Sequence, residues 1–91
     1  MTAEPRHYAP DEPIPTYAGD HVDHVQLGEW VYFEVSPALG VVGGRLLDAV
    51  QLMPGSQWHQ RDHMYTVREN SGQAWHGLRV YSAGQLSAMM D

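Results

Sequence analysis

The chain has 91 residues, a formal charge of −6 and no cysteine. The length corresponds to one small domain, and the lack of cysteine excludes disulfides, thiolate metal sites and thiol catalysis. All five of its basic side chains other than histidine are arginine. A net charge of −6 disfavours binding to nucleic acid phosphates, because such contacts need a basic face.

Residues 1–20 hold four of the six prolines and carry a local charge of −3. Proline fixes φ and removes a donor, so this composition predicts an extended, Pro-rich N-terminal arm. A solvated, disordered tail is one interpretation. The other is an arm that anchors on a partner subunit, with Tyr8, Ile14 and Tyr17 as its apolar contacts.

Residues 21–91 contain short β segments and are expected to form the folded domain. In residues 30–35, Val31, Phe33 and Val35 share one face of a strand. Residues 41–53 form a second apolar run, in which Gly43 and Gly44 indicate a bulge or a sharp bend near another backbone. A bent strand is favoured there, and a helix over residues 45–53 is the alternative.

The third and fourth segments, residues 64–68 and 75–81, flank the turn-rich residues 69–73 and predict a β-hairpin. Eight side chains are expected in the core: Val31, Phe33, Val35, Leu46, Tyr65, Val67, Leu78 and Val80. Apolar residues near the C-terminus stand at i, i+3 and i+4, which suits one or two helical turns, and a short strand is the alternative.

Four or five short strands with little helix predict an all-β fold, a small antiparallel barrel or half-barrel. The glycine and apolar spacing in residues 27–33, 40–46, 65–68 and 75–80 resembles that of the SH3-like small β-barrel. The resemblance covers about residues 27–86. It implies a binding scaffold and transfers no functional residue to this chain.

Histidine is unusually frequent, with six residues in the chain. Four of them form two closely spaced pairs, and each pair encloses an aspartate: His21, His24, His59 and His63. Imidazole nitrogen and carboxylate oxygen are zinc ligands, so a divalent-metal site is one hypothesis. Exposed loop histidines are the simpler interpretation, and no cofactor is expected.

Catalytic patterns are missing from the sequence. The chain has no cysteine nucleophile and no lysine, and none of its five serines lies in a G-x-S-x-G turn. Its glycines do not precede the Lys-Ser/Thr pair of a phosphate loop. The sequence therefore predicts a protein that is not an enzyme.

Aromatic side chains indicate the function. They fall mainly on strand faces opposite the aliphatic set, and Trp, Tyr and Arg dominate interface hot spots. The candidate partner contacts beyond the arm are Trp30, Tyr32, Trp58, Trp75, Arg79 and Tyr81. The alternative is that Trp30 or Trp75 caps an open end of the barrel or lies under the N-terminal residues. We expect a non-catalytic protein-interaction module, a subunit of a larger assembly that binds a protein partner or itself, and neither nucleic acid nor membrane.

The location follows from the same reasoning. No apolar run approaches the length that spans a bilayer, and the first residues lack the apolar stretch of a signal peptide. Together with the lysine-free composition, this suggests a cytoplasmic protein, or a phage particle component or mobile-element accessory protein assembled in the cytoplasm. The alternative function is a His-cluster divalent-metal-binding protein.

Overall fold

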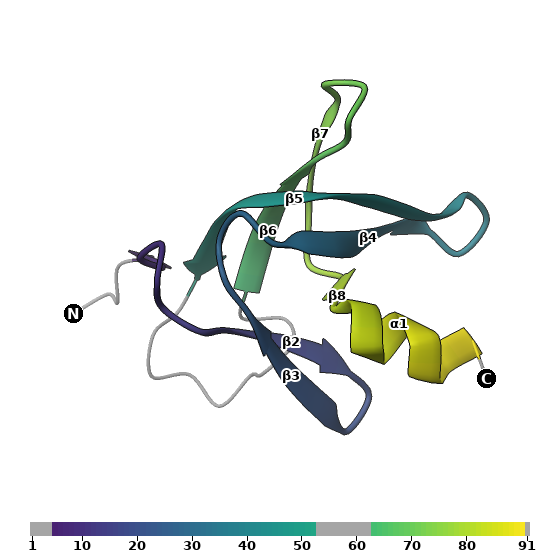
Figure 1. Ribbon diagram of the computed structural model, residues 1–91, viewed down its shortest axis with the longest axis horizontal. Coiled ribbons are helices and arrows are strands. Elements are labelled where there is room, and N and C mark those ends of the chain that lie inside the picture. The colour runs from purple at the N-terminus through teal and green to yellow at the C-terminus, as the bar shows by residue number, and fades with distance from the viewer. Residues whose placement is uncertain (1–4, 53–62, 91) are drawn as a thin grey trace.

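A computed structural model of the chain describes residues 5–52 and 63–90 (Figure 1). The predicted β-rich class is confirmed, because these residues form strands and one short helix. In chain order the elements are β1 (Arg6–His7), β2 (Ile14–Ala18), β3 (His21–Val25), β4 (Trp30–Ser36), β5 (Gly40–Gln51), β6 (His63–Arg68), β7 (Ala74–Gly77), β8 (Val80–Tyr81) and α1 (Ala83–Met90).

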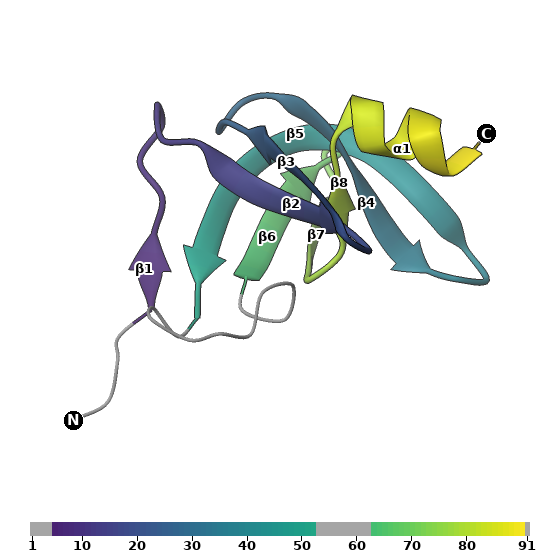
Figure 2. The same cartoon turned by 90° about the horizontal axis from the view of Figure 1, so that it is seen from below.

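The main sheet is antiparallel with the order β7-β6-β5-β4-β8, and β1 pairs with the end of β5. This order brings β8, which follows the hairpin of β6 and β7, back beside β4. The strands β2 and β3 form a separate hairpin, which crosses the curved main sheet (Figure 2). The core therefore lies between this hairpin and one face of the main sheet.

The long strand β5 confirms the bent strand predicted for the second apolar run. A Cβ atom at Gly44 would lie 2.5 Å from the Arg68 carbonyl oxygen, so another backbone does pass close there. The pairing of β5 with β6 shifts between Leu46 and Asp48, which is the irregularity that lets the strand bend. The predicted hairpin is also present, since the Glu69 amide donates to the Gln73 carbonyl oxygen over 2.9 Å.

Two of the expected core residues are less buried than predicted. Leu78 is 38% exposed and Val35 is only partly buried, whereas the other six are buried. Leu78 lies between β7 and β8, where the strand is interrupted. The alternation of inward and outward side chains therefore does not continue from β7 into β8.

The N-terminal residues differ from the expected arm. Ile14 is 0% exposed and Tyr8 is also in the core, and the Tyr8 amide donates to the Ala49 carbonyl oxygen over 3.1 Å. The expected boundary after residue 20 falls at the turn between β2 and β3. Proline is tolerated here because β2 pairs on one side only, so Pro15 can face away from the ladder. A separate Pro-rich arm is thus not confirmed.

The helix α1 confirms the helical turns predicted at the C-terminus. Gln85 accepts a hydrogen bond from the Ser82 amide over 3.0 Å, and the Ser82 hydroxyl accepts one from the Gln85 amide over 3.1 Å. This reciprocal pair is a capping box, which satisfies donors at the start of the helix. The Ser82 hydroxyl also donates to Asp23 Oδ2 over 2.6 Å, so the cap joins α1 to β3.

We expect this contact to make stability depend on pH. The Ser82 hydroxyl, and next the His24 amide, hold the pKa of the Asp23 carboxyl below its ordinary value of 3.8. A carboxyl pKa that is lower in the folded state adds stability at pH values above the ordinary pKa. This stability is lost as the pH falls through the folded pKa. Asp23→Asn should therefore lower the melting temperature at about pH 6, with a difference that shrinks below about pH 3.

The matched control is Asp20→Asn, an exposed carboxylate at the turn of the same hairpin. Its melting temperature should follow that of the parent at both pH values. A difference between Asp23→Asn and the parent that persists unchanged at acid pH would contradict the role of the charged carboxylate.

Candidate functional site

The outer face of the main sheet, opposite the core, carries exposed aromatic and arginine side chains. Along β4, Trp30 and Tyr32 alternate with the buried Val31 and Phe33. The register places Arg45 of β5 directly opposite Trp30. The same register continues into β6, where Arg68 stands opposite Arg45. We call Trp30, Arg45 and Arg68 the arginine row.

Trp30 is held against β5 by the absence of a side chain at Gly43. A Cβ atom at that position would lie 2.8 Å from Nε1 of the indole, so only glycine leaves room for the ring. The Arg45 guanidinium carbon lies 5.8 Å from the centre of the Trp30 ring. Arg45 Nη1 also donates to the Gly28 carbonyl oxygen over 3.1 Å. Trp30 is 37% exposed, so it is partly accessible to solvent.

The sequence analysis singled out Trp30 but neither Arg45 nor Arg68. Each arginine is the chain neighbour of a buried side chain, Leu46 or Val67, so both point to the outer face. Their position opposite each other depends on the register of β5 and β6. The sequence does not determine that register, because the irregularity in β5 shifts it.

Two other predicted partner contacts also lie on or beside this face. Tyr32 is half-buried, and it pairs with Tyr81 across β4 and β8. Arg79 lies next to Glu34, with 3.6 Å between Nε and Oε2. Tyr81 itself is buried, in the region where α1 packs against β4 and β8. It is therefore not an exposed contact, contrary to the prediction.

Trp75 differs from the prediction as well. It is paired with the buried Val67 and stacks on Phe33 with 6.1 Å between ring centres, so it faces the core rather than the outer side. Its Nε1 is buried and has no hydrogen-bond partner. The interruption of the strand before Val80 explains the error, as for Leu78. Trp58 lies outside the described residues.

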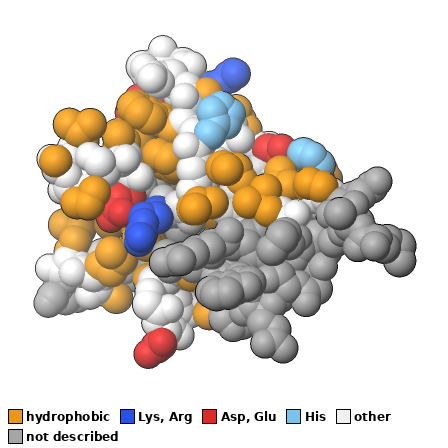
Figure 3. All heavy atoms as spheres, turned by 180° about the vertical axis from the view of Figure 1, so that it is seen from behind, with side chains coloured by type: hydrophobic (Ala, Val, Ile, Leu, Met, Phe, Trp, Pro, Cys, Tyr) orange, Lys and Arg blue, Asp and Glu red, His pale blue; other side chains and the backbone are white. Residues whose placement is uncertain are grey.

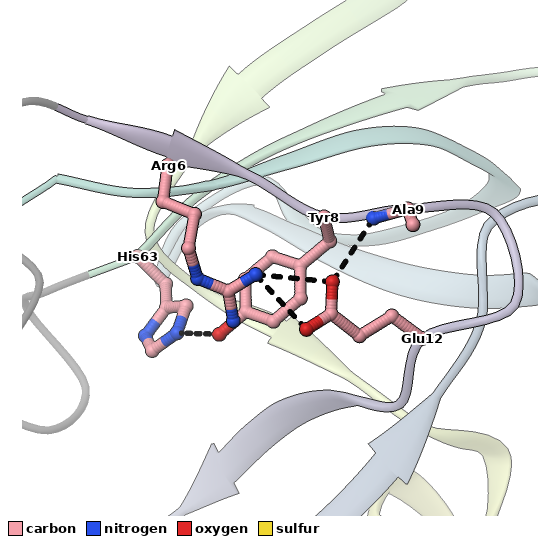
Figure 4. A network of polar contacts seen from close by, with 5 residues as sticks. All are labelled: Arg6, Tyr8, Ala9, Glu12 and His63. Carbon is pink, nitrogen blue, oxygen red and sulfur yellow. Dashed lines mark hydrogen bonds and ion pairs between the residues drawn. The ribbon is translucent and has the colours of Figure 1, made fainter.

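The tyrosines expected in the arm have partners within this chain. The Tyr8 hydroxyl and Nε2 of His63 are 2.8 Å apart (Figure 4). The Tyr17 ring lies 5.8 Å from the His63 ring. His63 also stacks on Tyr65, whose pKa is raised by burial. With Ile14 also in the core, the partner contacts proposed for the arm are directed inward.

Arg6 fixes the outer side of this cluster. Its guanidinium carbon lies 4.4 Å from the centre of the Tyr8 ring, and its Nη1 forms an ion pair of 2.9 Å with Glu12 (Figure 4). Glu12 also accepts a hydrogen bond from the Ala9 amide over 3.1 Å. This amide, followed by Arg6, lowers the pKa of the Glu12 carboxyl. The contacts hold the N-terminal segment closed over His63.

The candidate metal ligands are not brought together. His21 and His24 are exposed on β3, whereas His63 is buried among tyrosines. Within the described residues, no three His, Asp or Glu side chains are grouped as a metal would require. The Asp23 carboxylate between the first pair binds Ser82 instead. His59 falls outside the part of the chain that the structure describes.

Among residues 5–52 and 63–90, no helix is long and apolar enough to cross a membrane. No protein-family model, curated protein or solved structure matches the chain.

Proposed function

We propose that this protein is a non-catalytic protein-interaction module and a subunit of a larger assembly. The observation that carries the proposal is the outer face of the main sheet, where Trp30 is exposed beside arginines and the core packs on the other face. Trp and Arg dominate interface hot spots, because they combine a large contact area with hydrogen bonding. A hydrogen-bonded sheet holds these side chains in place before the partner arrives, which lowers the cost of binding.

Exposed apolar side chains elsewhere support the same proposal. In the view from behind, hydrophobic side chains are spread over the surface with few charged groups between them (Figure 3). Eight large apolar residues are exposed in the described part of the chain: Val22, Trp30, Leu39, Val41, Leu47, Leu78, Met89 and Met90. Single exposed apolar residues are ordinary, so these residues add to the apolar area that a partner could cover but do not by themselves mark one patch.

The proposal includes an SH3-like scaffold. Its support is the order of the main sheet, in which four strands follow as a meander from β4 to β7 and β8 returns to pair with β4. Such a return is what closes a small barrel. For the assembly itself we propose a phage particle or a mobile-element complex, which the small size and lysine-free composition support.

We expect a photo-reactive benzoylphenylalanine at position 30 to cross-link this chain to one partner protein in its own cell. The side chain at this position is exposed and lies over rigid backbone, so it would lie within the interface. The measurement is irradiation of intact cells followed by identification of the cross-linked band.

The control places the same group at Asp20, an exposed turn position in the β2–β3 hairpin. It should give no discrete band. Equal labelling from both positions, or none from position 30 in a well-expressed chain, would contradict an interface on the outer face.

A further inference from the structure

The arginine row concentrates positive charge at one point of an acidic protein. Arg45 and Arg68 are directly opposite each other on neighbouring strands. Side chains in this position have Cβ atoms about 5 Å apart, and like charges there repel each other. The formal charge of the whole chain is −6, so this pair stands out from its surroundings.

Neither guanidinium of the pair is neutralised by a carboxylate within residues 5–52 and 63–90. The ion pairs found there are Arg6–Glu12, His7–Asp48 and Arg79–Glu34. Arg45 uses one N–H group for the Gly28 carbonyl oxygen and lies near the Trp30 ring. Its other N–H groups, and those of Arg68, can therefore donate to an external acceptor.

We propose that Trp30, Arg45 and Arg68 form a docking site for an acidic segment of a partner protein. This inference rests on the interaction role proposed above and names the chemistry of the partner. A carboxylate can accept two parallel hydrogen bonds from a guanidinium, and a carboxylate between the two arginines would offset their repulsion. The indole provides the apolar contact for a neighbouring side chain of the segment.

The site is shaped before the partner binds. Gly43 leaves the space that the Trp30 ring occupies, and the ring in turn lies beside the Arg45 guanidinium. Fewer side-chain conformations are then lost on binding, which favours affinity. The sheet beneath is fixed by pairing of β4, β5 and β6.

Charge around the site favours a short acidic segment over a nucleic acid. Glu34 is four residues from Trp30 along β4, a distance of about 13 Å. Asp48 is three residues from Arg45 along β5, a distance of about 10 Å. Both carboxylates border the arginine row, one on either side, and both already have a partner, Arg79 for Glu34 and His7 for Asp48. A nucleic acid carries a phosphate at every nucleotide and would extend onto them, whereas one or two carboxylates fit between.

The charge also argues against a second copy as the occupant. Each copy carries a formal charge of −6, so two copies repel each other over their whole surfaces and not only at the contact. We therefore assign the site to a different protein with an acidic segment. Binding of a nucleic acid or of a second copy is an alternative outcome of the test.

The test is an NMR titration of the full chain with a short capped peptide in which glutamate alternates with threonine around one tyrosine. We expect saturable shifts of the Trp30 indole N–H and of the Nε–H groups of Arg45 and Arg68. Raising sodium chloride from about 20 to about 500 mM should weaken binding at least tenfold, because it screens the charges. The same peptide with glutamine in place of glutamate, and a short oligothymidylate, should cause no shifts.

Three variants separate the site from general charge. Arg68→Gln should weaken peptide binding at least tenfold while the melting temperature of the free protein stays equal or rises, because a like-charge neighbour is removed. Gly43→Ala should displace the Trp30 ring and also weaken binding. The matched control is Arg79→Gln, whose arginine is already paired with Glu34, and binding should change less than about twofold.

Four results would overturn the proposal. The first is that the glutamate peptide causes no shifts in the arginine row, and the second is that Arg79→Gln loses as much binding as Arg68→Gln. The third is that the oligothymidylate binds more tightly than the peptide. The fourth is that the shifts in the arginine row depend on protein concentration when no peptide is present. The third points to nucleic acid and the fourth to a second copy. If position 30 cross-links to a partner but the glutamate peptide causes no shifts, the interaction role stands and the acidic segment is excluded.

Discussion

An Ile14→Ala variant should lose about 2–5 kcal/mol of unfolding free energy, the usual cost of truncating a fully buried isoleucine. Ile14 is 0% exposed and belongs to the same core as Tyr8 and Val25. Native proteins have a total stability of about 5–15 kcal/mol, so the variant should lose a large share of it. Urea unfolding followed by tryptophan fluorescence measures the difference.

The matched control is Val22→Ala on the paired strand β3, where the side chain is 47% exposed. It should cost less than about 0.5 kcal/mol, as surface substitutions usually do. If the two variants unfolded at the same urea concentration, Ile14 would not be part of the core. The N-terminal segment would then behave as the arm that its composition suggests.

The N-terminal segment shows why composition was not sufficient. Its prolines argue against a helix interior and against a central strand, and neither forms here. β2 is instead half of a two-stranded hairpin, where a missing N–H can face away from the ladder. The alternation of Ile14 and Thr16 was visible in the sequence, but their burial depends on β3 and α1, which are distant in the chain.

The central strands could be predicted because their signals are local. Residues 30–36 and 63–68 alternate clearly, and the residues between β6 and β7 have the composition of a turn. The prediction was wrong where the alternation of inward and outward side chains was continued across the break between β7 and β8. Trp75, Leu78 and Tyr81 were all assigned to one continuous strand, whereas the structure breaks it between β7 and β8.

The candidate site was predictable only in part. Trp30 and Tyr32 were placed on the outer face, since their neighbours in β4 were clearly apolar and inward. The position of Arg45 opposite Arg68 needs the register between two strands, and β5 shifts that register by an irregularity. The hydrophobic pattern fixes the face on which each arginine lies, but the irregularity after Leu46 changes which residue of β6 stands opposite each residue of β5, so the pairing of charges could be found only in the structure.

The largest polar effect should come from Gln85→Ala, which we expect to cost about 2–4 kcal/mol. Gln85 is 1% exposed, and its side chain joins α1 to the β2–β3 hairpin. Oε1 accepts from the Ser82 amide and from the Thr16 hydroxyl over 2.8 Å, and Nε2 donates to the Thr16 carbonyl oxygen over 2.8 Å. Alanine would remove the Gln85 partner of the buried Ser82 amide and of the Thr16 carbonyl oxygen, and would leave the Thr16 hydroxyl with only its 3.4 Å contact to the Asp23 carbonyl oxygen. Burying polar groups without partners costs more than the hydrogen bonds themselves contribute.

The matched control is Gln73→Ala in the exposed turn before β7, which should unfold like the parent. Hydrogen exchange gives a second measurement that locates the effect. In Gln85→Ala, the amides of α1, β2 and β3 should lose more protection than the amides shared by β5 and β6, which should lose only as much as the global unfolding free energy falls. Uniform loss of protection across all strands would show that Gln85 stabilises the domain as a whole. Unchanged exchange in β2 and β3 would show that the hairpin does not depend on the helix for its place over the core.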